Sequence, residues 1–315
     1  MLDFTLETII SLLRSEDTRW DAIMQLRSLD QAEVGSLLIP YLSDPEWVIR
    51  WIVAEKLGDL GEVEATLPLI KLLRDEDSHV RKNAFKSLIK LGYRSVPEIV
   101  TFLAHPAPDF RRQLLEILLE MGDKILPELG QAMGNDNWVI ANKVVEIIWR
   151  IGGPDAEDLL IEGLDKPLIR KNAIVLLGLM KNKRALAPLL KQFDEPSIRK
   201  IILSAFKNIG KEASFIFLID SLAWKNRGLQ HQSEEAILRI GKPILKHLIR
   251  GLVKHRAGDR TKILQLIEKI DPEEAMSDIG KLVKKDPALD DFTKAFRIRY
   301  RSPGVMSQFL KLLGS

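Results

Sequence analysis

Cysteine is absent from the 315-residue sequence. Its absence excludes a disulfide framework, a catalytic thiol and thiolate metal ligands, and it fits a reducing cytosol. Residues 1–10 lack the basic start of a secretory signal. The longest apolar run, 173–180, is much too short to cross a bilayer. We therefore expect a cytoplasmic protein without a membrane span.

Motifs that carry chemistry are also missing. The sequence has no HExxH, no Walker phosphate loop, no GxSxG and no EF-hand loop. Of the five histidines, His247 and His255 are expected on the surface of a basic helix, without a further metal ligand. We predict no catalytic residue, no metal site and no cofactor. The sequence gives no grounds for an enzymatic activity and favours a non-catalytic protein.

A pattern that returns every 29 to 31 residues organises the chain. Residues 80–92 show it most completely, with apolar residues at helical spacing between Arg81 and Gly92. The glycine returns at Gly61, Gly92, Gly122, Gly152, Gly210 and Gly241, and Lys181, Asp271 and Arg301 stand where it is next expected. The arginine, eleven residues earlier, forms a column of Arg50, Arg81, Arg111, Arg170, Arg199 and Arg260, with exceptions at Ala141, Gln230 and Asp290.

A period of this length is typical of a solenoid, whose units bury their apolar faces only against their neighbours. Each unit reads as a short first helix, a turn rich in Asp, Glu and Pro, and a second helix that a glycine ends. No Pro/Gly/Ser-rich linker interrupts the pattern, so we predict one continuous array over 1–315. Residues 1–30 are expected to form an amino-terminal cap, and 285–315 a degenerate carboxyl-terminal cap.

These columns resemble HEAT repeats, in particular the short bacterial repeats named after phycobilisome lyases. The resemblance implies an all-α solenoid, a right-handed superhelix of about ten helix pairs. It also implies that the arginine column is structural and bonds to turn aspartates, for which Asp44, Asp75, Asp136, Asp165 and Asp194 are the candidates. HEAT-repeat deoxyhypusine hydroxylases bind iron through His-Glu dyads, and no histidine here is followed by Glu.

The residue after the column arginine has no such structural role. In a HEAT superhelix the second helices line the concave surface, so these residues would form a basic ladder with steps of about 10 Å. Two tryptophans, fourteen residues before their glycines, would anchor a partner if exposed. The predicted partner-binding residues are Lys82, Arg112, Lys143, Lys171, Lys200, Trp47 and Trp138.

Charge is divided unevenly along the chain. Residues 1–160 carry 17 Lys+Arg and 27 Asp+Glu, whereas 161–315 carry 30 and 17. The segment 296–301 also interleaves aromatics with arginines. We predict a protein-interaction scaffold or assembly factor that binds a partner with an acidic surface. Two alternatives stay open: a phycobilin lyase or related tetrapyrrole-handling protein, and a nucleic-acid-binding protein of the HEAT-type DNA glycosylase class that uses its basic second half.

Overall fold

The computed structural model describes residues 2–29, 33–255, 257–285, 289–290 and 293–294. Within these ranges the chain is helical and contains no β-strand, as the repeat pattern predicts. The basic and aromatic segment 296–301 and almost all of the predicted cap 285–315 lie outside the described residues. Contacts between residues group the chain into two units, Met1–Ala173 and Ile174–Ser315, with the boundary inside one helix.

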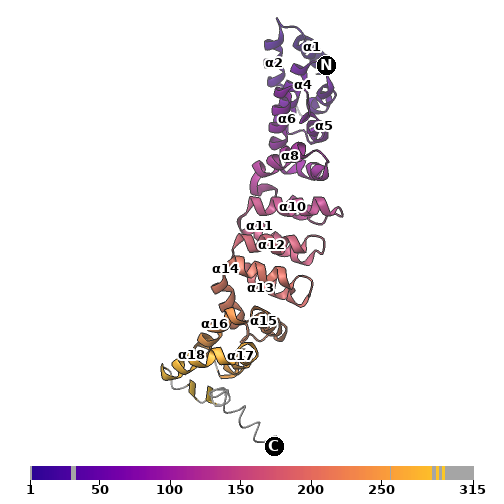
Figure 1. Ribbon diagram of the computed structural model, residues 1–315. Coiled ribbons are helices and arrows are strands. Elements are labelled where there is room, and N and C mark those ends of the chain that lie inside the picture. The colour runs from indigo at the N-terminus through magenta and orange to yellow at the C-terminus, as the bar shows by residue number, and fades with distance from the viewer. Residues whose placement is uncertain (1, 30–32, 256, 286–288, 291–292, 295–315) are drawn as a thin grey trace, which may run out of the picture. The chain divides into compact units, whose positions relative to one another are not determined.

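Between residues 33 and 151 short first helices alternate with longer second helices (Figure 1), whereas the first helix, 2–13, is longer than the second, 19–28, and two later helices are joined at Gly210. Unit 1 contains α1 (Leu2–Leu13), α2 (Arg19–Ser28), α3 (Glu33–Leu38), α4 (Trp47–Leu60), α5 (Thr66–Leu72), α6 (Ser78–Leu91), α7 (Val96–Thr101), α8 (Pro108–Met121), α9 (Leu126–Ala132), α10 (Trp138–Ile151) and α11 (Gly153–Glu162). The boundary falls in α12 (Arg170–Met180). Unit 2 continues with α13 (Leu186–Lys191), α14 (Arg199–Ser221), α15 (Arg227–Ile240), α16 (Leu245–Lys254), α17 (Ala257–Ile270) and α18 (Pro272–Lys285).

The glycine column ends the second helices with left-handed backbone. Gly61, Gly92, Gly122, Gly152 and Gly241 have φ between +62° and +71°, a region that glycine enters without steric cost. Gly210, with φ +136°, separates the two halves of α14. Lys181, which replaces the glycine, has φ +56° and is the one non-glycine residue with positive φ in the described part of the chain. The backbone at this position of the repeat therefore keeps its positive φ even where lysine replaces glycine.

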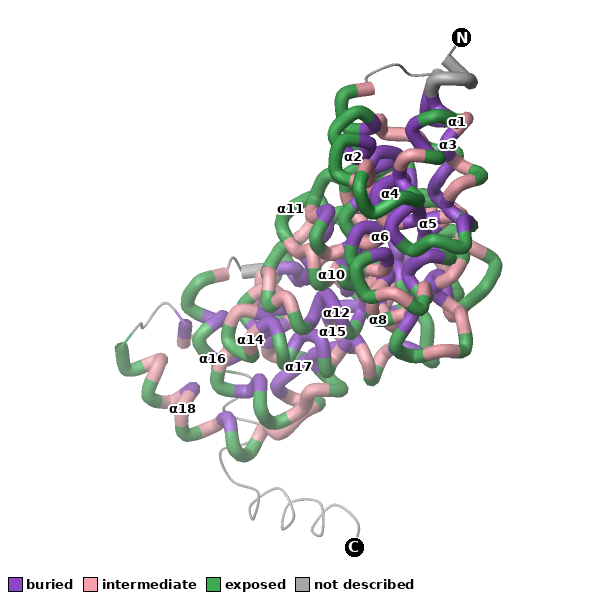
Figure 2. The backbone as a smooth tube through the Cα atoms, turned by 90° about the horizontal axis from the view of Figure 1, so that it is seen from above, coloured by how far each residue is buried: buried purple, intermediate pink, exposed green. Residues whose placement is uncertain are grey.

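The core lies between successive helices, as the purple segments of Figure 2 show. In α6, Val80, Ala84, Leu88 and Leu91 are almost completely buried, as their helical spacing predicts. Neighbouring second helices approach closely at Gly58, where an added Cβ would lie 2.6 Å from the Cβ of Ser87. The Ser87 hydroxyl donates to the carbonyl oxygen of Ala54 at 2.7 Å, so the contact between α4 and α6 is both tight and hydrogen-bonded.

Candidate functional site

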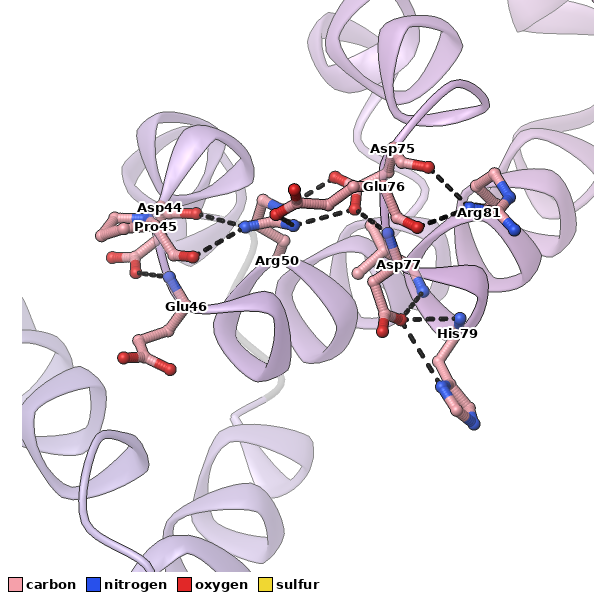
Figure 3. A network of polar contacts seen from close by, with 10 residues as sticks. Asp44, Pro45, Glu46, Arg50, Asp75, Glu76, Asp77, His79 and Arg81 are labelled. Atoms are coloured by element: carbon pink, nitrogen blue, oxygen red, sulfur yellow. Dashed lines mark hydrogen bonds and ion pairs between the residues drawn. The ribbon is translucent and has the colours of Figure 1, made fainter.

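The column arginines bind the turn that precedes their own helix. The Arg81 Nη1 donates to the carbonyl oxygens of Asp75 and Glu76 at 2.7 and 2.8 Å (Figure 3). These acceptors stand six and five residues earlier in the chain. The same two offsets recur in donations from Arg50 to Asp44 and Pro45, from Arg111 to His105 and Pro106, and from Arg199 to Phe193 and Asp194, and Arg170 donates to Leu164. The guanidinium thus supplies hydrogen bonds to turn carbonyls that have no helical partner.

Arg50 also connects two repeats. Its Nε and Nη2 donate to both carboxylate oxygens of Asp75 at 2.8 Å each, across 25 residues of sequence. The side chains of Arg50 and Asp75 are only 8% and 7% exposed. A bidentate pair this well buried fixes the spacing and orientation of the two turns.

Charge and hydrogen bonding shift the pKa values of both members of this pair. Burial acts to raise the pKa of Asp75, but hydrogen bonds from Arg50 and the Asp77 N–H, together with the charge of Arg50, hold that pKa below its ordinary value. The hydrogen bond to Asp75 in turn raises the pKa of Arg50. Both groups are therefore charged at neutral pH, and each stabilises the charged form of the other.

Besides the bond from Arg50 to the predicted aspartate Asp75, the column arginines share an acceptor that the sequence did not indicate. The sequence pointed to turn carboxylates, whereas the acceptors that recur are turn carbonyls. Asp44 pairs instead with Arg14 at 2.6 Å, and Asp194 accepts from Gln232 at 2.6 Å. The remaining member, Arg260, donates to the carbonyl oxygen of Val253 at 3.4 Å.

Two residues outside the predicted column make the same bond. The Arg19 Nε donates to the Leu13 carbonyl oxygen at 3.1 Å, which extends the pattern into the first helix pair. The Gln230 amide, at an exception to the column, donates to the Trp224 carbonyl oxygen, again six residues earlier. A long side-chain donor at this position makes the bond, and α10 forms without one, because Ala141 stands there.

Each second helix of unit 1 also presents one exposed face, which we call the second-helix face. It consists of residues at every fourth position, which lie on one side of a helix. Its members on the five second helices α2, α4, α6, α8 and α10 are Trp20 and Met24; Trp47, Trp51, Glu55 and Asp59; Ser78, Lys82, Lys86 and Lys90; Pro108, Arg112, Glu116 and Glu120; and Trp138, Asn142, Glu146 and Arg150. Four of the predicted partner-binding residues, Trp47, Lys82, Arg112 and Trp138, fall on it.

The predicted ladder cations differ in how they are paired. Lys82, Lys171 and Lys200 are exposed and make no ion pair within the described ranges. Arg112, by contrast, lies 3.1 Å from Asp109 and 4.0 Å from Glu116. Lys143 donates to Glu146 at 2.8 Å. The ladder is therefore not a uniform row of free positive charge, because carboxylates neutralise part of it.

A groove brings two of these cations together. It lies between α8 and α10, has a volume of about 210 Å³, and is lined by Arg111, Arg112, Lys143, Glu146 and Arg150 over apolar side chains that include Leu103, Leu115 and Ile147. Burial acts to raise the pKa of Glu146, but hydrogen bonds and charge from Lys143 and Arg150 lower it overall. Glu146 thus pairs with Lys143 and Arg150, while Asp109 and Glu116 lie beside Arg112, so carboxylates offset most of the positive charge of the groove.

The tryptophans on this face are solvent-accessible. Trp138 is 64% exposed and Trp47 is 41% exposed, with the Trp47 ring 5.5 Å from that of His79. Sequence reasoning missed Trp20 and Met24, which are 71% and 63% exposed. Trp51 and Trp20 lie 31 and 62 residues before Lys82, which is one and two repeats. The repeat spacing could therefore have identified Trp20 as equivalent to Lys82. The equivalence was overlooked because these two repeats carry tryptophan where several of the later ones carry a cation.

His247 and His255 are not the surface pair that the sequence indicated. In unit 2 they line a cavity of about 200 Å³ with Glu212, Asp220 and Arg250. The His255 side chain is only 10% exposed and lies 3.1 Å from an Asp220 oxygen. Burial and the charge of Arg250 lower the pKa of His247, against the opposing charge of Glu212. The described residues hold no cluster of three or more His, Cys, Asp or Glu placed to bind a metal ion.

Known proteins resemble the chain at several levels. A search of curated proteins gives no match. Human deoxyhypusine hydroxylase, in complex with glycerol, is 18% identical over 75% of this chain and 95% of its own, with a TM-score of 0.31. The complex of CpcE and CpcF of phycocyanin lyase from a Nostoc species is 19% identical over 73% and 94%, with a TM-score of 0.30. An engineered protein is 14% identical over 88% and 91%, with a TM-score of 0.29. At these identities and scores the structures carry no argument about function.

Two further findings concern the whole chain and the family. No helix in the described part of the sequence is long and apolar enough to cross a membrane. The family model for HEAT repeats matches residues 35–102, which contain α4, α6 and the Arg50–Asp75 bridge. The arginine and glycine columns continue on the carboxyl-terminal side of this segment with the same spacing. Residues 35–102 of this chain are HEAT repeats.

Proposed function

We propose that the protein is a non-catalytic scaffold or assembly factor that binds a protein partner with an acidic surface through its second-helix face. The observation that carries the proposal is the pair Lys82 and Lys86 on α6. Both are exposed, they lie one helical turn apart, and neither makes an ion pair among the described residues. Because these two lysines have no structural role and lie on a packed helix, they can pair with the carboxylates of an acidic partner surface.

The surroundings of these lysines support the same function. The second-helix face carries exposed tryptophans, which are enriched among residues that dominate binding energy. The groove between α8 and α10 places Arg112 and Arg150 on the same face, each beside a carboxylate. We further propose that the repeats form one continuous array over 1–315, in which Lys171 and Lys200 would extend the binding surface. We also propose that the protein works in the cytoplasm.

Affinity capture of the tagged full-length protein from native lysate tests the proposal. Half of the lysate is treated with nuclease, and each eluate is analysed by mass spectrometry and by absorbance. A stoichiometric acidic protein that survives nuclease is the expected result. Capture that disappears with nuclease would instead favour nucleic-acid binding by the basic second half, and a visible-light chromophore would favour the tetrapyrrole-handling class.

A matched pair of charge reversals locates the binding surface. The double variant Lys82→Glu/Lys86→Glu should reduce capture of the partner at least tenfold. The control Lys71→Glu/Lys124→Glu changes the net charge equally, at exposed lysines outside the second helices. Equal loss in both variants would show that only overall charge matters, and no loss in the first would exclude α6 as the docking site.

A further inference from the structure

The amino-terminal end of the second-helix face is apolar. Trp20 and Met24 lie one helical turn apart on α2 and are 71% and 63% exposed. On the next second helix, Trp47 is 41% exposed and Trp51 is half-buried. Three of the six tryptophans of the chain therefore gather on two adjacent helices. Large apolar side chains clustered at a protein surface mark an interaction site.

One ion pair beside these tryptophans is already formed within the chain. Arg27 pairs with Glu55 at 2.8 Å, and its guanidinium carbon lies 5.9 Å from the centre of the Trp51 ring. Glu55 also accepts a hydrogen bond from Asn83 at 3.1 Å. Because Arg27 and Glu55 neutralise each other, this pair offers a partner contact area rather than net charge. The free charge begins at Lys82 and Lys86, on the following second helix.

We propose that the face from α2 to α6 binds an extended acidic segment that carries aromatic or large aliphatic side chains at one end. The apolar end docks on Trp20, Met24 and the α4 tryptophans, and the carboxylates pair with Lys82 and Lys86. This inference rests on the proposed function and specifies the partner's chemistry. Charge complementarity selects the acidic part, and burial of apolar area supplies the anchor.

The repeat spacing sets the length of the segment. Two steps separate α2 from α6, and second helices pack about 10 Å apart, so the anchor and the carboxylates are separated by about 20 Å. An extended chain covers about 3.3 Å per residue, so about six residues connect the two features. The segment is therefore short enough to be a linear motif within a larger partner.

Selection of peptides from a random displayed library against the full-length protein tests this specificity. Peptides that bind should combine two or more Trp, Phe, Leu or Met residues with a cluster of Asp or Glu about six positions away, in one chain direction only. Their affinity should fall when salt is raised, since the ionic part is at the surface. Binders without this pairing of features would overturn the inference.

Three variants separate the two claims. Trp20→Ala/Met24→Ala and Lys82→Glu/Lys86→Glu should each weaken the selected peptides at least tenfold. Tyr93→Ala is the control, because this aromatic side chain is 56% exposed but lies in the turn after α6, outside the second-helix face, and should change affinity less than twofold. Peptides that need the lysines but not Trp20 and Met24 would contradict the inference and leave the proposed function standing. Peptides that need neither pair would contradict both. Unchanged thermal unfolding of each variant shows that the fold is intact.

Discussion

Two sides of the same helix perform different tasks, and neighbouring residues show the difference. Arg81 is half-buried and donates to two turn carbonyls, whereas Lys82, the next residue, is exposed and makes no ion pair in the described part of the chain. The first position usually carries a long donor, which is arginine in most repeats and Gln230 in one, with Ala141 as an exception. The second position varies more, and along unit 1 it reads Trp20, Trp51, Lys82, Arg112 and Asn142. The turn network therefore holds the fold, and the exposed face is where binding properties can diverge.

The strongest expected effect is at Arg50. Arg50→Ala removes the bidentate partner of Asp75 and leaves a carboxylate that is 7% exposed without its counter-charge. Breaking a buried ion pair from one side costs about 3 kcal/mol. Urea unfolding followed by circular dichroism should show this loss. A change below about 1 kcal/mol would mean that the bridge between the repeats does not hold them together.

Arg81 and Lys82 give the most direct contrast between the two sides. Arg81→Ala should lower the free energy of unfolding by about 1 to 2 kcal/mol, because two turn carbonyls lose a charged donor. Lys82→Ala should change it by less than about 0.5 kcal/mol, as expected for an exposed side chain. Thermal unfolding of the two variants under identical conditions measures the difference. Equal effects would remove the distinction between a structural and a binding position.

Acid should weaken the contribution of the Arg50–Asp75 pair. The pKa of Asp75 is lower in the folded protein than its ordinary value of 3.8, so its stabilisation is complete above that value and is lost as pH falls through the lower, folded-state pKa. The stability difference between the wild type and Arg50→Ala should therefore narrow below about pH 4. Unfolding of both proteins between pH 7 and pH 3 tests this. A difference that stays constant would show that Asp75 is not the titrating partner.

The smallest effect is expected at Lys181 and has the opposite sign. Its φ of +56° is strained for a residue with a Cβ. Lys181→Gly should relieve that strain, and after the entropy cost of glycine it should stabilise the protein by about 0.5 kcal/mol. Lys183→Gly, at a nearby position without positive φ, is the control and should not stabilise. Destabilisation by Lys181→Gly would indicate that the lysine side chain contributes more than the backbone strain costs.

Much of the fold could be predicted from the sequence because it follows from periodic constraints. The glycine column predicted where second helices end, and its spacing located the left-handed residue at Lys181 even though the residue type differs. Arg50 binds Asp75, a turn aspartate that the sequence named, but the turn carbonyls that the column arginines share leave no trace in the sequence. Asp271 shows another limit, since it stands at a glycine position without positive φ.

The candidate site was predictable only in part. Register places Lys82 and Arg112, and likewise Trp47 and Trp138, at equivalent positions of their helices, and all four are exposed. The ion pairs of Arg112 and Lys143 depend on side-chain conformations that a column of cations does not indicate, although acidic residues three or four positions away were visible. Trp20 and Met24 were missed because they stand at the positions that lysines occupy in α6 but are not cations.

Oxidative footprinting of the complex with the captured partner tests the central claim most directly, because tryptophan, methionine and tyrosine side chains react when solvent reaches them. Binding through the second-helix face predicts that Trp20 and Met24 become protected. Tyr93, which is 56% exposed and lies in the turn after α6, should stay reactive and serves as the internal control. Protection of Tyr93, with Trp20 and Met24 unchanged, would place the partner elsewhere on the molecule and contradict the account.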